Sequence, residues 1–284
     1  MLKFVVRNKK LLLWLNKMPV VKRCFVFDFT ALNTIEDEDF YNLVFSHIIV
    51  SNGLTKTTRS GRFSDLDEVI VQLLQKVGKA AVHDTGVSNG VTSLELYKKL
   101  EQAGVDADFY VSDKFAKIYY KGNAVKKFYD ADGHLISVNF LFCHFSPRIG
   151  KAFFLSRWLF TLFQQKKKPD KSSLKEIVLL APPVYKQIAA GNILLPDFDV
   201  FETRAIQSFT FLRCMNVLMP AYFSTDRIVE GVNNLKNNLV EGGYLLLGRT
   251  DADNVNHASL YICSGGQLQL IQVFNRGFDY NNPL

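Results

Sequence analysis

The sequence is poor in cysteine, and its cysteines have no spacing that would bind a metal or build a disulfide framework. Structural zinc sites need closely spaced Cys or His pairs, and small secreted domains need a higher density of cysteine. We therefore predict no metal site and expect reduced thiols in a cytoplasmic protein. The four widely separated cysteines are Cys24, Cys143, Cys214 and Cys263.

Long apolar runs are missing as well. The most apolar helical segment covers residues 152–163, which is twelve residues, whereas a helix that crosses a bilayer needs about 20. Residues 11–15 are too short for the core of a secretory signal and are followed by Lys17. Neither segment is therefore expected to span a membrane or to direct secretion.

Acidic residues are absent from two basic stretches, residues 1–27 and 147–168. The first carries Trp14 among leucines, and the second carries Trp158 within the apolar segment 152–163. Each helix either packs its apolar side on the protein or lies on a membrane or partner with its aromatic side chains inserted. Peripheral membrane contact therefore stays open beside simple burial. The basic residues of the first stretch are Lys3, Arg7, Lys9, Lys10, Lys17, Lys22 and Arg23.

The composition fits a folded chain with a substantial core. Of the 284 residues, 48% are hydrophobic and 13% aromatic. The length allows either one α/β domain of typical size with an extension or two small domains. The formal net charge of +7 allows an anionic partner. However, no basic run alternates with stacking aromatic residues as in a nucleic-acid module, so we expect no nucleic-acid partner.

Two common nucleotide-binding loops are absent: G-x-G-x-x-G and the P-loop G-x-x-x-x-G-K-[ST]. Instead, the short apolar run Ala80–Val82 leads into a loop with Gly86 and Gly90, and a helix begins near Leu94. A strand, a glycine loop and a helix N-terminus in this order can present backbone N–H groups and a positive helix dipole to a ligand. A tight turn without any ligand is the alternative.

A second strand, residues 107–113, ends at Asp113. The distance from Gly90 suits one helix and one return strand, and an acid at this point of an α/β fold can accept the hydroxyls of a ribose. A polar, basic loop, residues 51–64, precedes the helix before the first strand. It either closes over the site or is a mobile surface loop.

The remaining pattern predicts an α/β fold. It is a Rossmann-like, mostly parallel sheet with an antiparallel C-terminal hairpin over residues 257–274, a helical N-terminal extension and an inserted β-hairpin that turns at residues 130–133. We predict two consecutive parts: a basic helical extension and cap over 1–77, and the Rossmann-like domain over 78–284, with its insertion at about 116–168.

The segment Asp84-x-Gly86-x-Ser88-x-Gly90 resembles the first motif of class I S-adenosylmethionine (SAM) dependent methyltransferases. Residues 213–218 and 239–248 are similar to the C-R-N-V-L and L-x-P-G-G-x-L-x-x-G patterns of the chemotaxis-receptor members. The resemblance covers roughly residues 78–275. Met215 stands where that pattern has Arg, and the paired Phe of its upstream segment is missing, so receptor glutamates are not the expected acceptor.

The resemblance implies SAM as the cofactor. Asn216 would then lie near the sulfonium, and Arg213 and Tyr222 are the candidates for the acceptor side, against the alternatives of a surface arginine and a packed tyrosine. Asp199, rather than Asp197, would approach the adenine, and Asp113 would hold the ribose. The residues expected around the methionine and ribose are Asp84, Gly86, Ser88 and Gly90.

The function predicted from this resemblance is SAM-dependent methyl transfer to an unidentified acceptor, either a small molecule or a lipid-like one. The alternative is a SAM- or nucleotide-binding sensor or scaffold without catalysis. A hydride-transfer dehydrogenase is a weaker third hypothesis, because the G-x-G-x-x-G spacing is missing.

Overall fold

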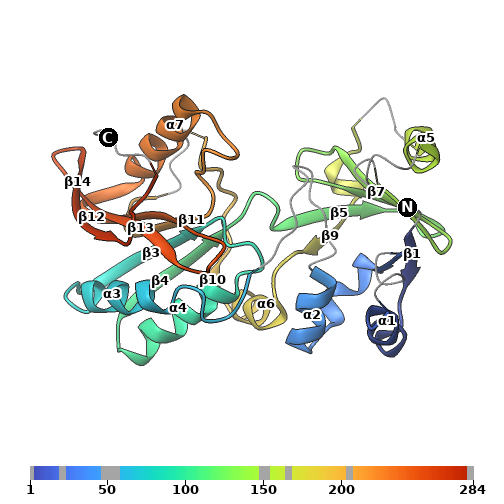
Figure 1. Ribbon diagram of the computed structural model, residues 1–284, viewed down its shortest axis with the longest axis horizontal. Coiled ribbons are helices and arrows are strands. Elements are labelled where there is room, and N and C mark those ends of the chain that lie inside the picture. Colours follow the sequence, from blue (N-terminus) through green and yellow to red (C-terminus); the bar gives the residue numbers. More distant parts are fainter. Residues whose placement is uncertain are drawn as a thin grey trace. The chain divides into compact units, whose positions relative to one another are not determined.

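The computed structural model describes residues 3–18, 24–45, 58–146, 154–163, 168–202 and 207–279. The chain forms two compact units (Figure 1). Unit 1 contains residues 1–57 and 115–182, and unit 2 contains residues 58–114 and 183–284. Each unit is built on a seven-stranded sheet.

The sheet of unit 2 is mostly parallel. Its five neighbouring parallel strands, numbered by their order along the chain, are arranged 3-2-1-4-5, and an antiparallel hairpin follows at one edge. This is the order of a doubly wound, Rossmann-like sheet. The predicted fold class and its C-terminal hairpin are confirmed. In spatial order the strands are β10 (Ile193–Leu194), β4 (Asp106–Ser112), β3 (Lys79–Thr85), β11 (Phe209–Met215), β12 (Leu239–Thr250), β13 (Asn256–Ser264) and β14 (Gln267–Phe274).

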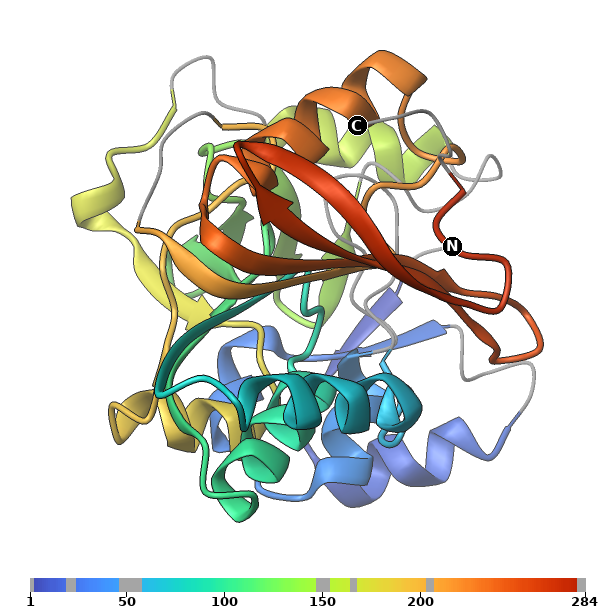
Figure 2. The ribbon, with the colours of Figure 1, turned by 90° about the vertical axis from the view of Figure 1, so that its left-hand side faces the viewer.

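Helices cover both faces of this sheet. In Figure 2, α3 (Ser64–Leu74) and α4 (Val91–Gln102) lie along one face and α7 (Thr225–Lys236) lies along the other. Helix α6 (Pro182–Ala189) leads into β10. The core under α7 is made of apolar side chains from α7 and the central strands, among them Ile228, Val232, Leu235, Leu212, Cys214, Leu245 and Leu247.

The sheet of unit 1 is antiparallel except for its β1–β2 pair. In spatial order it contains β2 (Phe25–Phe27), β1 (Lys3–Val6), β8 (Cys143–Phe145), β7 (Leu135–Phe140), β6 (Val125–Tyr129), β5 (Lys117–Lys121) and β9 (Lys175–Val178). Its helices are α1 (Lys9–Asn16), the 3-10 turn η2 (Phe29–Thr34), α2 (Glu38–Phe45), α5 (Phe154–Phe163) and the short η3 (Lys171–Ser173).

The two units do not follow the predicted division at residue 78. The N-terminal segment is not purely helical, because β1 pairs with β8 and so joins the inserted segment in one sheet. The predicted hairpin exists as the β6–β7 pair, but it belongs to this larger sheet. Strands of three and four residues that pair with a segment far along the chain leave little local pattern to recognise.

The apolar helices of unit 1 are buried on one side only. In α1, Leu12 and Leu15 are buried and Trp14 is exposed; in α5, Phe160 is buried and Trp158 is exposed. Residues 152 and 153 of the predicted apolar segment lie outside the described residues. Within the described ranges, no helix combines the length and the apolar character that a membrane crossing requires.

Candidate functional site

The candidate site lies where the strand order of unit 2 reverses. The chain leaves β3 toward β4 on one side and leaves β11 toward β12 on the other. In open α/β sheets, ligands bind outside the carboxyl ends of the strands at such a switch point. The loop after β3 is the glycine loop singled out by the sequence, so the topology brings the predicted motif to the expected place.

The glycine loop alternates through left-handed backbone conformations. Gly86 has φ +74°, Ser88 has φ +57° and Gly90 has φ +80°. A Cβ atom on Gly86 would come within 2.1 Å of a methyl group of Val217, which follows β11. Gly86 is therefore required both for its backbone angle and for the close packing of the β3 and β11 loops.

Most of the loop's N–H groups are used inside the protein. Gly86 and Val87 both donate to the carbonyl oxygen of Ser112, at 2.8 and 3.2 Å, and Gly90 donates to Val87 at 2.9 Å. The Ser88 N–H donates to the Asp113 carboxylate at 2.8 Å. The Asn89 side chain caps the Val91 N–H at 3.1 Å, so these five groups are not directed at a ligand.

Ser112 joins the ends of β3 and β4, a role that no sequence pattern indicated. Besides its carbonyl, its hydroxyl lies 2.8 Å from the His83 Nε2 atom and 3.1 Å from the Thr85 hydroxyl. Burial lowers the pKa of His83 to about 4, against a weaker raising effect of Asp84. His83 is therefore neutral near pH 7 and serves as a buried hydrogen-bonding group.

Asp113 and Asp199 both lie at the carboxyl end of the parallel strands. Asp113 follows β4, and β10 pairs beside β4 and leads to Asp199. The Asp199 carboxylate accepts from the Phe201 N–H at 3.0 Å and from Lys114 Nζ at 3.2 Å. Both acids predicted to contact a nucleoside thus flank the end of β4.

Asp84 and Arg213 face the protein interior and form a buried ion pair. They are register partners on β3 and β11. The Arg213 Nε and Nη2 atoms donate to the two Asp84 oxygens at 2.9 and 2.6 Å, and the Ser93 hydroxyl donates to Asp84 at 2.6 Å. The structure therefore offers no support for the predicted contact of Asp84 with a ligand, or of Arg213 with an acceptor; Arg213 is not a surface arginine either.

Asp67 on α3 completes this cluster. Its Oδ1 accepts from Arg213 Nη1 at 2.6 Å, and the guanidinium lies over the Phe63 ring at 5.2 Å. Burial raises the pKa of Asp67 to about 6, against the lowering effect of Arg213. For Arg213, burial alone would lower the pKa, but Asp84 and Asp67 outweigh it and raise the pKa. Arg213 therefore has a structural role: its fully buried guanidinium binds two carboxylates and joins β3, β11 and α3 beneath the glycine loop.

Asn216 and Tyr222 follow β11. Asn216 has φ +61°, and its side-chain oxygen accepts from the Thr250 N–H at 2.8 Å, so it joins the ends of β11 and β12. Tyr222 is about half-exposed in the next turn. Asn216 thus directly follows β11, with its side-chain oxygen bound to β12, whereas Tyr222 lies further along the loop.

The basic segment before α3 is fixed against unit 2 over its described residues. The Gly61 N–H donates to both Glu95 oxygens on α4, at 2.8 and 3.0 Å. Arg62 Nε donates to the Thr250 hydroxyl at 3.1 Å, and Asn256 donates to the Arg62 carbonyl at 2.8 Å. Residues 61 and 62 therefore link α4 to the end of β12, and residues 51–57 of the predicted loop lie outside the described residues.

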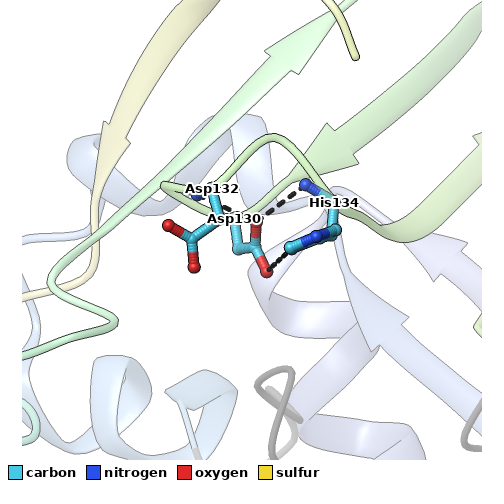
Figure 3. Close-up of side chains that lie close together, drawn as sticks. All are labelled: Asp130, Asp132 and His134. Carbon is cyan, nitrogen blue, oxygen red and sulfur yellow. Dashed lines mark hydrogen bonds and ion pairs between the residues drawn. The ribbon is translucent and has the colours of Figure 1, made fainter. Parts of the chain in front are cut away.

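One group among the described residues has the composition of a cation site: Asp130, Asp132 and His134, in the β6–β7 turn of unit 1 (Figure 3). The Asp130 Oδ1 atom accepts from the N–H groups of Asp132 and His134 at 3.1 and 2.8 Å. Its other oxygen lies 3.4 Å from His134 Nδ1. These bonds shape the hairpin turn, and we assign no metal to it.

No protein-family profile matches the sequence, and a search of curated proteins finds no match. Solved structures with partial similarity include the N-methyltransferase NodS of Bradyrhizobium japonicum in complex with S-adenosylhomocysteine, at 10% identity and a TM-score of 0.33 over 66% of this chain and 62% of NodS. A SAM-dependent methyltransferase described as putative, from Methanococcus maripaludis, has 10% identity and a TM-score of 0.33, over 66% of this chain and 57% of its own. A SAM-dependent methyltransferase from Clostridium acetobutylicum has 10% identity and a TM-score of 0.36, over 78% of this chain and 76% of its own.

The chain thus matches about three fifths of the length of the first two structures. Similarities at these identities and TM-scores do not place the chain in a family. The strand order and the loop geometry described above carry the functional interpretation instead.

We predict that Gly86→Ala destabilises unit 2 more than Gly104→Ala does. Both glycines have left-handed φ angles, but a Cβ at Gly104 meets nothing within 4 Å. The control should cost about 1–2 kcal/mol for the backbone alone, and Gly86→Ala about 1–3 kcal/mol more for overpacking. Urea unfolding measures both. Val217→Ala should restore part of the stability of Gly86→Ala; equal effects of the two glycine variants would contradict the packing described.

Asp67 also generates a pH prediction. Because its pKa is about 6 in the folded protein and about 3.8 in the reference state, its effect on stability is favourable at low pH and is lost as pH rises through 6. Asp67→Asn lacks this titration. The melting temperature of the variant minus that of the wild type should therefore rise from about pH 4 to about pH 6 and then level off. A difference that is constant over this range would contradict the assignment.

Proposed function

We propose that this chain is a SAM-dependent methyltransferase with its cofactor site at the β3–β11 switch point of unit 2. The observation that carries the proposal is the contact between the two sequence motifs: the Asp113 carboxylate after β4 accepts the Ser88 N–H of the glycine loop at 2.8 Å. A loop that approaches a ligand closely and an acid that accepts hydroxyl groups then lie side by side, as a nucleoside cofactor requires.

The hydrogen bonds of the loop support a cofactor without phosphates. Phosphate-binding loops direct their backbone N–H groups at the anion. Here the N–H groups of Gly86 and Val87 go to Ser112, and that of Ser88 goes to Asp113. SAM has no phosphate and needs no such cradle, whereas NAD and nucleoside triphosphates do. The same geometry weighs against the dehydrogenase hypothesis.

In this proposal Asp113 accepts the ribose hydroxyls, and Gly86, Ser88 and Gly90 let the backbone approach the cofactor. Asp199 lies on the adenine side, held by Lys114, and Asn216 lies on the side of the entering acceptor. Asp84 and Arg213 support the loop from below through their ion pair.

The bound cofactor supplies an activated methyl group, so the chain's own contribution is to align the acceptor and exclude water. Tyr222, a half-exposed side chain after β11, is the residue that we propose on the acceptor side. We propose a small or lipid-like acceptor. Incubation with methyl-labelled SAM and separated lipid and metabolite fractions, followed by counting of label in each fraction, tests for transfer.

Asp113→Ala should weaken SAM binding at least about tenfold, because a hydrogen bond to a charged group contributes about 1.5–3 kcal/mol. Titration calorimetry measures the affinity. Asp108→Ala is the matched control: Asp108 is an exposed acid on β4, the strand that Asp113 follows, and it pairs with Lys79 at 2.9 Å. Asp113→Asn retains an oxygen that can accept the Ser88 N–H. This variant therefore separates weaker binding of the ribose from a change in the conformation of the glycine loop. Unchanged affinity in Asp113→Ala would exclude this role.

A further inference from the structure

The turn between β7 and β8 in unit 1 shows two large apolar side chains to solvent. Phe140 and Cys143 are register partners, so Leu141 and Phe142 form a two-residue hairpin loop. Leu141 is 66% exposed and Phe142 is 60% exposed. The Phe142 ring stacks on the Phe4 ring, with 6.1 Å between the ring centroids. Turn residues are normally Gly, Asn or Asp, so two large apolar side chains that stay more than half exposed are unusual at this position.

The backbone of this turn makes the choice of leucine more unusual. Leu141 has φ +54°, a left-handed conformation that costs a residue with a Cβ atom energy and that glycine adopts freely. Such strain persists mainly where it has a use. The strained residue here is also the more exposed of the two, which points to a contact outside the unit.

Helix α5 packs against β7 and β8, the two strands that this turn connects. Its Phe163 ring lies 6.2 Å from the Phe140 ring and 6.3 Å from the Phe145 ring, and Phe160 is buried on the sheet. Trp158 and Leu162, four residues apart on the same side of the helix, are 50% and 60% exposed. We call the exposed set the apolar rim: Phe140, Leu141, Phe142, Trp158 and Leu162.

The excess positive charge of the chain lies in unit 1. Unit 1 contains 20 Lys and Arg against 9 Asp and Glu, whereas unit 2 contains 14 against 18. Lys127 donates to the Phe163 carbonyl at 3.0 Å, which holds a cation at the end of α5. In the sequence, the residues that flank α5 include Arg148, Lys151 and 166–168, with no acid from 147 to 168. Cations around exposed Trp, Phe and Leu are the composition of a surface that binds anionic lipid.

We propose that unit 1 docks on an anionic lipid bilayer through the apolar rim, with Leu141 and Phe142 inserted at the tip and the surrounding lysines on the headgroups. An acidic protein partner would use the cations, but it would not require two apolar residues at the apex of a hairpin. The bilayer accounts for both features. It also suits a lipid-like acceptor, although the docking surface does not depend on the proposed methyl transfer.

The test uses the full chain and sedimentation with phosphatidylcholine vesicles, with and without phosphatidylserine. The wild type should sediment with the phosphatidylserine vesicles and lose this at high salt. The double variant Leu141→Gly, Phe142→Ser should bind at least about tenfold more weakly. Its melting temperature should change little, because glycine relieves the left-handed turn and offsets loss of the half-exposed ring contact between Phe142 and Phe4. The matched control, Leu270→Thr with Val273→Thr, removes two exposed apolar side chains from β14 of unit 2 and should bind as the wild type does.

Fluorescence gives an independent readout. In a Trp14→Phe background, Trp158 is the remaining tryptophan of the two in the chain, and its emission should move to shorter wavelength with phosphatidylserine vesicles. The proposal would be overturned by no sedimentation at low salt, by equal sedimentation of the tip variant, or by a large fall in its melting temperature. A tip variant that abolishes self-association would instead identify the rim as an interface between copies, which also overturns it.

Discussion

The buried ion pair between Arg213 and Asp84 is the interaction on which the candidate site depends. It joins β3 to β11 at the point where the sheet reverses its order, directly below the glycine loop, and Arg213 is completely buried. Removal of one partner from such a pair leaves an uncompensated buried charge, which typically costs about 3–5 kcal/mol. Asp67 and Ser93 extend the pair to α3 and α4, so the helices that support the loop are fixed by the same charges.

The glycine loop that follows β3 is held by its own hydrogen bonds and by packing. Ser112 and Asp113 at the end of β4 accept its N–H groups, and Val217 after β11 fills the space beside Gly86. The loop is therefore shaped before any ligand arrives, which reduces the entropy that binding must overcome. This preformed shape, with its N–H groups turned inward, distinguishes it from a phosphate-binding loop.

Much of unit 2 could be predicted from the sequence because its signals are local. The parallel sheet could be predicted from apolar runs followed by the loop of Gly86 and Gly90. The position of Asp113 could be predicted because it lies one helix and one strand after that loop. The role of Arg213 could not be predicted, because its partners Asp84 and Asp67 lie 129 and 146 positions away and their pairing depends on strand register. The same limit applies to unit 1, where β1 pairs with β8 across more than a hundred residues.

The central claim is that the switch point of unit 2 binds SAM and not a phosphate-bearing cofactor. Calorimetric titration of the purified chain with SAM, with NADH as the comparison ligand, tests it most directly. We expect SAM to bind with about micromolar affinity, a binding free energy near −8 kcal/mol, and NADH not to bind. Binding of NADH, or of neither ligand, would contradict it, because the loop would then cradle a phosphate or serve only as a turn.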